Sequence, residues 1–187
     1  MAMSEEVRNI FKLSRDWLSV QEVVAAVSSA SCGAISLFIG TTRADELDGR
    51  KVIGLEYEAY EAMVQSELSR LCDDIRARWP GVTHICVHHR LGSHHMLMLL
   101  LGPSGHLFTP PLCSAFRWVK VGEASVVMAI SSPHRHDGQQ AIQHLIEQLK
   151  ACVPVWKKEV YDSHEAAWKE NAECGWSSRH EDATQKL

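Results

Sequence analysis

The segment Ser131-Ser132-Pro133-His134-Arg135 places cationic side chains between a predicted strand and a predicted helix. The strand is the apolar stretch that ends at Ser132, and the helix starts near Asp137. The planar guanidinium of an arginine matches a phosphate group, and the N–H groups of a helix N-terminus point toward the same anion. His134 and Arg135 are therefore candidate phosphate ligands, and the alternative is a solvated pair on a surface loop.

Two further segments carry cations at the ends of predicted elements. Lys150 lies in the last turn of that helix, where a cation also interacts favourably with the helix dipole. In the short strand predicted for Val155 to Tyr161, Lys157 and Lys158 point to opposite faces, so that one can face a pocket and the other solvent. Gly40-Thr41-Thr42-Arg43 follows another predicted strand and suits either an anion site or a polar turn.

Metal and thiol chemistry are the competing interpretations. The chain has 11 histidines, but the doublets His88-His89 and His94-His95 point to opposite faces of a strand, and no Cys/His spacing matches a zinc site. No metal ligands are therefore predicted, although a metal-binding or regulatory module remains an alternative. The thiols of Cys32, Cys86 and Cys152 lie in apolar sequence, where a raised pKa makes a cysteine unreactive.

The composition indicates one globular domain. The 187 residues include 45% hydrophobic and 22% charged residues, and the net charge of -4 argues against a general nucleic-acid binder while allowing a local basic pocket. Met1 to Val20 lacks the apolar core of a secretory signal, and the longest apolar run, Met96 to Leu101, is too short to cross a membrane. We therefore expect a cytosolic protein with no membrane contact and with reduced cysteines.

The hydrophobic pattern predicts an α+β fold with a mixed or antiparallel sheet, because pairs of strands alternate with helices. The predicted central strand is the almost entirely apolar stretch from Ala124 to Ser132, and a capping box at Ser19 opens the first helix. The residues from Ser93 to Trp118 fit no element. The expected order is a helix to residue 27, a buried strand 32–39, a strand 52–60, a helix 61–79, strands 83–90 and 124–132, a helix 137–152 and a final strand 155–161.

Several motifs in this order resemble one family, the large, catalytic subunit of molybdopterin synthase in its vertebrate-type form. The resemblance extends from about Val20 to Trp176. The motifs are Cys32-Gly33-Ala34-Ile35-Ser36-Leu37-Phe38-Ile39-Gly40-Thr41-Thr42-Arg43, Leu55-Glu56-Tyr57-Glu58-Ala59-Tyr60, His89-Arg90-Leu91-Gly92, Val121-Gly122-Glu123-Ala124-Ser125-Val126-Val127, Ser131-x-x-His134-Arg135, and Leu149-Lys150 before Pro154-x-Trp156-Lys157-Lys158-Glu159.

The resemblance implies a fold of the α/β hammerhead type in a single domain, residues 19–176, between an N-terminal extension (1–18) and a polar tail (177–187). It implies a homodimer of large subunits within a heterotetramer, in which each large subunit binds a small ubiquitin-like subunit. The C-terminal thiocarboxylate of that small subunit would donate sulfur to cyclic pyranopterin monophosphate and form the dithiolene of molybdopterin. No cofactor and no nucleophilic cysteine are expected in this sulfurtransferase.

The resemblance also implies roles for individual residues. Arg43, His134 and Arg135 would bind the phosphate region of the substrate. Lys150 would stabilise the thiocarboxylate or the tetrahedral adduct, and Lys157 would act as acid or base. Lys158 and Glu159 would complete the substrate-binding strand. Cations are needed in such a site because a phosphate and a thiocarboxylate repel each other in a poorly solvated pocket.

Residues 93–118 depart from the family pattern, in which a short connection joins the His-Arg-Leu-Gly motif to the next strand. One interpretation of this stretch is translated non-coding sequence or an unusual splice form, and the other is a genuine surface insertion. A long loop by itself costs little entropy, although its apolar run favours contacts or aggregation. The alternative function is accordingly a non-catalytic isoform, disabled by this insertion, that still dimerises or binds the small subunit.

Overall fold

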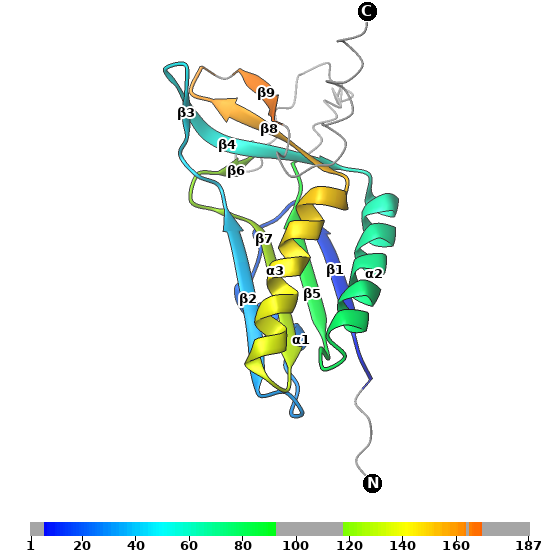
Figure 1. The fold of residues 1–187 in the computed structure, drawn as a ribbon. Coiled ribbons are helices and arrows are strands. Elements are labelled where there is room, and N and C mark those ends of the chain that lie inside the picture. The colour runs from blue at the N-terminus through cyan, green and yellow to red at the C-terminus, as the bar shows by residue number, and fades with distance from the viewer. Residues whose placement is uncertain (1–5, 93–117, 164, 170–187) are drawn as a thin grey trace, which may run out of the picture.

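A four-stranded sheet forms the body of the molecule in the computed structural model, which describes residues 6–92, 118–163 and 165–169 (Figure 1). Strand β1 pairs with β5 in parallel, and β5–β7 and β7–β2 are antiparallel, so the sheet is mixed, as predicted. In the order of the sheet its strands are β1 (Asn9–Ser14), β5 (Ile85–Arg90), β7 (Ala124–Ser132) and β2 (Ala34–Thr41).

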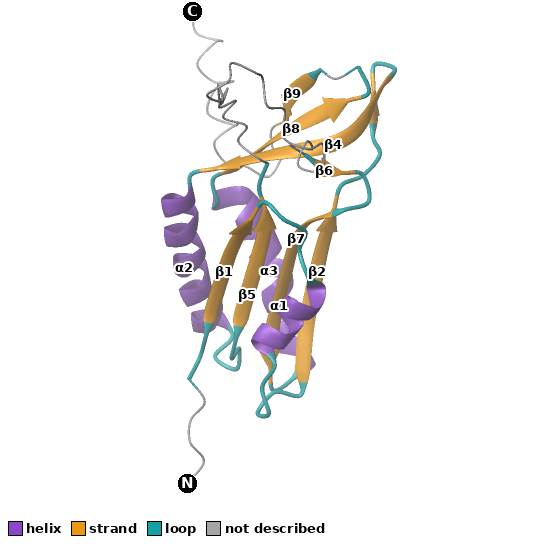
Figure 2. Ribbon diagram, turned by 180° about the vertical axis from the view of Figure 1, so that it is seen from behind, coloured by secondary structure: helices purple, strands orange, loops and turns teal. Residues whose placement is uncertain are grey.

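Helices cover both faces of this sheet. Helix α1 (Val20–Val27) lies on one face, and α2 (Glu61–Arg78) and α3 (Arg135–Cys152) lie on the other (Figures 1 and 2). Successive side chains of β7 point to opposite faces of the sheet, so Met128 packs against α2 and α3 and Val127 packs against α1. Strand β7 is therefore the central buried strand that its apolar composition predicts.

A second sheet of five strands, called the small sheet because three of those strands have four residues or fewer, lies across the end of α3 (Figure 1). Its longest strand, β4 (Arg50–Ala59), pairs with β8 (Val155–Tyr161), which in turn pairs with β9 (Ala166–Lys169). Two-residue strands β3 (Glu46–Leu47) and β6 (Val119–Lys120) also pair with β4. This sheet brings segments from the middle and from the end of the chain together above the main sheet.

The helix predictions are confirmed, with shifts of one or two residues. Ser19 Oγ accepts a hydrogen bond from the Glu22 N–H at 3.2 Å, which is half of the predicted capping box. The other half is replaced, because the Glu22 carboxylate accepts from Lys12 Nζ at 2.8 Å. Helix α3 starts at Arg135 rather than near Asp137, so His134 is the residue that precedes its first turn.

Three strand expectations were wrong or incomplete. The stretch predicted as a buried strand became β2, an edge strand whose Ile35, Leu37 and Ile39 are about 40% exposed. Full burial would require cover on both faces and a partner on each side, which an edge position does not provide. Strand β1 lies inside the segment expected to be an extension, and β9 follows β8, which was expected to be the final strand.

No helix in the described ranges is both long enough and apolar enough to pass through a lipid bilayer. The expected insertion lies outside the described residues, apart from its last residue, Trp118. The indole of Trp118 rests directly on Gly54 of β4, where any side chain on residue 54 would collide with it. Trp118 therefore belongs to the packed structure rather than to the insertion.

Candidate functional site

The predicted cationic residues Arg43, Lys150 and Lys157 all lie where the two sheets meet. Arg43 follows the end of β2, Lys150 occupies the last turn of α3, and Lys157 lies in β8, which begins directly after that helix. Strand β2 and α3 finish at the same end of the molecule (Figure 1), so the fold brings these three separate segments to one region.

A buried ion pair fixes this junction. Arg90 Nη1 lies 2.6 Å from Glu123 Oε2, and each side chain is 10% exposed. The same Glu123 accepts a hydrogen bond at its backbone carbonyl from the Thr42 N–H at 3.1 Å, and Gly122 N–H donates to the Thr42 carbonyl at 2.9 Å. The backbone directly before Arg43 is thereby tied to the end of β5 and the start of β7.

Arg43 itself reaches into solvent from this fixed point. Its side chain is 81% exposed and pairs with Asp45 at 3.2 Å, a contact that is weak at the surface and that an incoming anion can replace. Beside it, the Thr42 hydroxyl is buried and has no hydrogen-bond partner among the described residues. Arg43 therefore suits an anion ligand, because the backbone before it is anchored and its guanidinium is exposed.

Lys157 shares one face of the small sheet with Glu159. It lies directly opposite Tyr57 of β4 on one side and Lys169 of β9 on the other, and residues opposite each other in a pair point to the same face. Glu159 Oε1 lies 2.8 Å from Lys169 Nζ, and Glu159 Oε2 accepts from the Tyr161 hydroxyl at 2.9 Å.

Burial by itself would raise the pKa of Glu159. The hydrogen bonds from Lys169 and Tyr161 outweigh that effect, and the net pKa lies below the ordinary value. Glu159 is therefore ionised, buried and already bound by two residues of its own chain. In this state it supports the strand rather than presenting its carboxylate to a ligand.

Lys158 points to the opposite face, as the alternation predicts. Its ammonium lies 2.6 Å from Glu58 Oε1 and 4.0 Å from the centre of the Trp168 ring. This combination of ion pair and cation–π contact holds β8 against β4 and β9. Of the two adjacent lysines, Lys157 is the one on the face that carries Glu159 and Lys169.

His134 and Arg135 lie at the other end of α3 from Lys150. A helix rises about 1.5 Å per residue, so the 15 positions between Arg135 and Lys150 separate them by roughly 22 Å. Both His134 and Arg135 are exposed. Within a single chain the structure therefore does not bring them together with the lysines.

A cavity of about 240 Å³ lies beside the Lys150 end of α3, lined by apolar residues that include Leu149, Val153 and Val155. The ring of His89 also lines it and makes an edge-on contact with Tyr57, with ring centres 5.0 Å apart. Complete burial lowers the pKa of His89 to about 4, so this histidine is neutral at neutral pH. The cavity lining is therefore mostly apolar with a neutral His89, and its charged members are Lys12 and Glu61.

The thiol predictions require a correction. Burial raises the pKa of Cys86 to about 11, which agrees with an unreactive thiol. Cys32 differs: burial would raise its pKa, but its hydrogen bonds with hydroxyls that include those of Thr83 and Ser131 lower the pKa below the ordinary value. Cys152 is exposed rather than enclosed by apolar residues. Among the described residues, no three His, Cys, Asp or Glu side chains are grouped as metal ligands.

The sequence patterns missed Lys169 and Tyr161. Tyr161 was expected only as the end of a strand, and β9 was not expected because four residues of mixed polarity carry almost no periodic signal. The adjacent Trp168-Lys169 pair was the only local sign of a strand that packs an aromatic ring. Both residues enter the site through strand pairing, which their own sequence does not specify.

The fold and the site together define an α+β protein with a cation-lined junction between two sheets. The model of the family described as MoaE protein matches residues 13–97 and 118–152. The chain belongs to this family. The residues between the two matched ranges all fall within the stretch that departs from the family pattern.

Curated relatives agree with this assignment. Molybdopterin synthase catalytic subunit 1 of Aedes aegypti is 47% identical over 176 residues, which is 93% of this chain and 97% of the relative. The molybdopterin synthase catalytic subunit of Taeniopygia guttata is 45% identical over 91% of this chain and 93% of its own length. The human protein of that name is 42% identical over 94% of this chain and 79% of its own length.

Solved structures have the same fold. Molybdopterin synthase from Staphylococcus aureus superposes with a TM-score of 0.67 at 26% identity, covering 86% of this chain and 97% of that one. A chain of the complex of subunits 1 and 2 of molybdopterin-converting factor from Helicobacter pylori gives a TM-score of 0.60 at 18% identity, covering 88% and 92%. The α+β fold expected from the family resemblance is confirmed.

Proposed function

We propose that this chain is the catalytic subunit of a molybdopterin synthase. It would transfer sulfur from the C-terminal thiocarboxylate of a small ubiquitin-like subunit to cyclic pyranopterin monophosphate. The observation that carries the proposal is that the segments bearing Arg43, Lys150 and Lys157 all reach the junction of the two sheets. The 42–47% identity to molybdopterin synthase catalytic subunits supports this assignment.

The cations of the site offset the electrostatic repulsion between the two reactants. Donor and substrate are both anions, and their repulsion grows as the site excludes water. In the proposed arrangement Arg43 binds on the phosphate side, while Lys150 stabilises the thiocarboxylate or its tetrahedral adduct. Lys157 transfers the proton. In each transfer a carbon–sulfur bond forms on the substrate as a carbon–oxygen bond of that carbon breaks and the oxygen leaves. Water then cleaves the acyl–sulfur bond, so the sulfur stays on the substrate and the donor leaves as a carboxylate.

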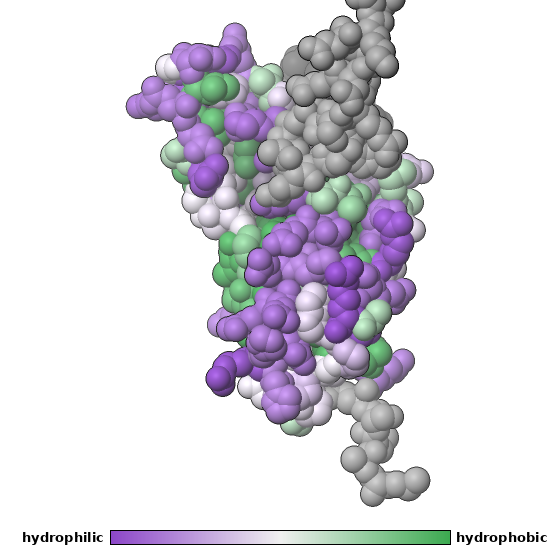
Figure 3. Space-filling view, viewed as in Figure 1, coloured by the Kyte–Doolittle hydropathy of each residue, from purple (hydrophilic) through white to green (hydrophobic). Residues whose placement is uncertain are grey.

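A second copy of the chain is part of the proposal, and β2 is the surface that supports it. Strand β2 lies at the edge of the main sheet and exposes an apolar row, and Figure 3 shows apolar surface on that side of the molecule. An apolar edge strand is a template for pairing with another strand. The exposed residues of the row are Ile35, Leu37 and Ile39.

Pairing of two β2 strands would also account for His134 and Arg135. A twofold axis reverses the direction of the strand, so the Ala34 end of one copy would lie beside the Thr41 end of the other. The start of α3 lies at the Ala34 end, because Gly138 packs closely on Ser36 and Ser132. His134 and Arg135 of the second copy would then approach Arg43 of the first and complete the phosphate site.

The direct test is molybdopterin formation by the purified chain with thiocarboxylated small subunit and cyclic pyranopterin monophosphate. We expect product from the full chain, and a loss of roughly a hundredfold or more for Lys157→Ala and for Lys150→Ala. Arg70→Ala serves as the matched control, since Arg70 pairs with Glu67 on the outer surface of α2 and should retain full activity.

A version that lacks Ser93 to Arg117 and keeps Trp118 separates the two candidate functions. Trp118 must stay, because it packs on Gly54. Product from both forms supports a catalytic subunit with a tolerated insertion. Product from the shortened form alone supports the non-catalytic isoform, which would still dimerise or bind the small subunit. No product from either form, with both folded, would contradict the proposed function.

A further inference from the structure

Lys169 is the nearest described neighbour of Lys157 across the β8–β9 pair. The two residues are directly opposite in the register, so their side chains leave the same face of the small sheet. The carboxylate of Glu159 belongs to that face as well, two residues along β8. Two lysines thus share one buried carboxylate.

Lys169 forms a charged hydrogen bond with this carboxylate. Its ammonium lies 2.8 Å from Glu159 Oε1, whereas the effect of Lys157 on Glu159 is electrostatic and weaker than the hydrogen bond from Lys169. The Lys169 side chain is 46% exposed and Glu159 is 7% exposed, so the lysine approaches the carboxylate from the solvent side. Lys169 therefore occupies one oxygen of the carboxylate that lies on the same face as Lys157.

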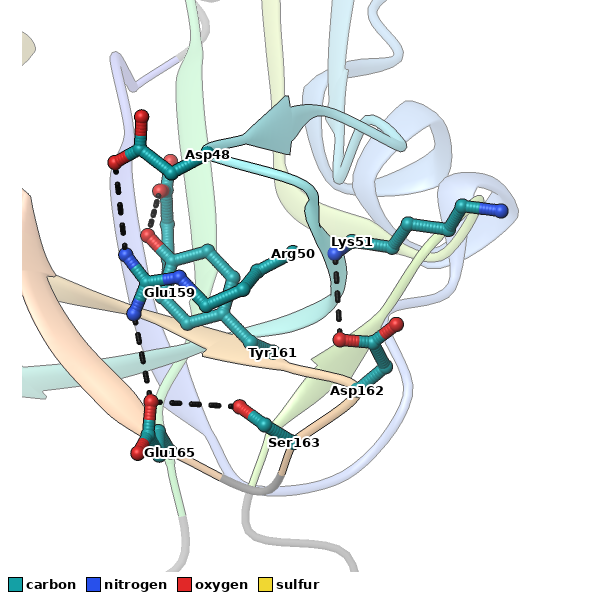
Figure 4. Close-up of polar contacts among 8 residues, drawn as sticks. All are labelled: Asp48, Arg50, Lys51, Glu159, Tyr161, Asp162, Ser163 and Glu165. Carbon is teal, nitrogen blue, oxygen red and sulfur yellow. Dashed lines mark hydrogen bonds and ion pairs between the residues drawn. The ribbon is translucent and has the colours of Figure 1, made fainter.

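The other oxygen of Glu159 is bound by a buried residue of the same strand. Tyr161 donates its hydroxyl to Oε2 at 2.9 Å, and the Arg50 guanidinium lies 4.6 Å above the Tyr161 ring (Figure 4). Arg50 is in turn anchored by Glu165 at 3.4 Å and by Asp48 at 3.9 Å. Because Tyr161 is fixed in this way, the carboxylate cannot turn away from the face that Lys157 shares.

Lys169 also connects this face to Arg43. The carboxylate of Asp45, which pairs with Arg43, favours the charged form of Lys169 through space. Asp45 thus pairs with Arg43 and acts weakly on Lys169, while Lys169 pairs with Glu159 on the face of Lys157. Removal of Lys169 would leave the Glu159 charge facing Lys157 alone.

We propose that Lys169 is a positioning residue of the sulfur-transfer site, an inference that rests on the proposed function. It holds the carboxylate of Glu159 and so prevents that carboxylate from capturing the ammonium of Lys157. Lys157 then directs its ammonium toward the anionic donor and substrate. In this account Lys169 does not touch the substrate, and its effect depends entirely on the presence of the Glu159 charge.

The test compares Lys169→Met, Lys169→Arg, Glu159→Gln and the double variant Lys169→Met/Glu159→Gln in the full chain. The first readout is the rate at which N-hydroxysuccinimidyl acetate acetylates Lys157, followed by peptide mass spectrometry. Acylation requires the neutral amine, so capture by Glu159 should slow it roughly tenfold in Lys169→Met. Lys169→Arg keeps the ion pair, and the double variant lacks the carboxylate, so both should react like the wild type.

The second readout is the steady-state formation of molybdopterin. We expect Lys169→Met to lower kcat with little change in the KM for the substrate, and the double variant to recover most of the loss. A double variant that stays as slow as Lys169→Met would overturn the proposal in favour of direct substrate binding by Lys169. Equal acetylation of Lys157 in all variants would overturn it as well.

Thermal melting of each variant excludes a trivial loss of the fold. The acetylation experiment needs neither donor nor substrate, so it decides the role of Lys169 even if the chain makes no molybdopterin. An inactive wild type with slowed acetylation in Lys169→Met would contradict the proposed function and leave the positioning role intact. An active wild type with unchanged acetylation in Lys169→Met would support the proposed function and contradict the positioning role of Lys169.

Discussion

The guanidinium of Arg90 and the carboxylate of Glu123 meet at 2.6 Å in the junction between the two sheets. Both side chains are almost fully buried, so removing one partner leaves an uncompensated charge in a poorly solvated place. We expect Glu123→Ala to lower the free energy of unfolding by roughly 3–5 kcal/mol in urea denaturation. Arg70→Ala, which breaks an exposed pair with Glu67, should cost no more than about 1 kcal/mol. Equal losses in the two variants would contradict the buried pair.

Acid should destabilise the protein through His89. Burial lowers its pKa from the ordinary 6.5 to about 4, so between these values the unfolded chain binds a proton that the folded chain does not. Protonation linked to His89 therefore has little effect on the free energy of unfolding above pH 6.5, and it lowers that free energy as the pH drops from 6.5 toward 4. From pH 7 to pH 5 this one group should remove about 2 kcal/mol.

The matched variant for this prediction is His89→Gln, which keeps a polar side chain but cannot titrate. Urea denaturation at pH 7 and pH 5 gives the change in the free energy of unfolding for each protein. We expect a smaller loss on acidification for the variant than for the wild type, even if the variant is less stable at pH 7. An identical pH dependence would show that His89 does not carry the effect.

Gly54 is expected to be sensitive to even the smallest side chain. A Cβ at this position would overlap the Cδ1 atom of the Trp118 indole, which packs on the β4 backbone. Gly54→Ala should therefore cost roughly 1–3 kcal/mol, the usual penalty of overpacking. The same change in a Trp118→Val background should cost clearly less, because the overlapping ring is gone. Equal costs in both backgrounds, measured by urea denaturation, would rule out the overlap.

The proposed β2 pairing predicts which surface change separates two copies. A charge at Leu37, in the middle of the exposed row of β2, would have to be buried against the second copy. We expect Leu37→Asp to shift the protein from dimer to monomer in sedimentation velocity. Leu47→Asp is the control, since Leu47 is similarly exposed but lies on β3 in the other sheet. A Leu37→Asp protein that stays dimeric at all concentrations would refute this interface.

Local patterns predicted the elements that are long or strongly periodic. The stripe of Val64, Leu68, Leu71 and Ile75 predicted α2 within one residue, and the apolar run of β7 predicted a central strand. These patterns are visible in the sequence because each residue on a helix face or in a buried strand meets the same apolar environment. Strands β6 and β9, with two and four residues, are too short for such repetition and were missed, and the six-residue β1 was missed as well.

The sequence likewise predicted the residue types of the site but not how all of them are arranged. The residue types of Arg43, Lys150 and Lys157 indicate an anion site, and the fold places them in one region. The fold also separates His134 and Arg135 from that region by the length of α3, although all of these residues belong to one set of family motifs. Adjacent motifs in a family therefore do not imply contact within one chain.

Residue types and their spacing were enough to predict the fold class, the long helices, the central strand and a set of cations suited to an anion site. These features depend on residue type and on spacing over one or two turns. Long-range strand pairing, by contrast, makes β2 an exposed edge and brings Lys169 of β9 to the face that Lys157 shares with Glu159. Those outcomes depend on which distant strands pair and in which register, and pairing energy is set by the surfaces that meet rather than by either strand alone.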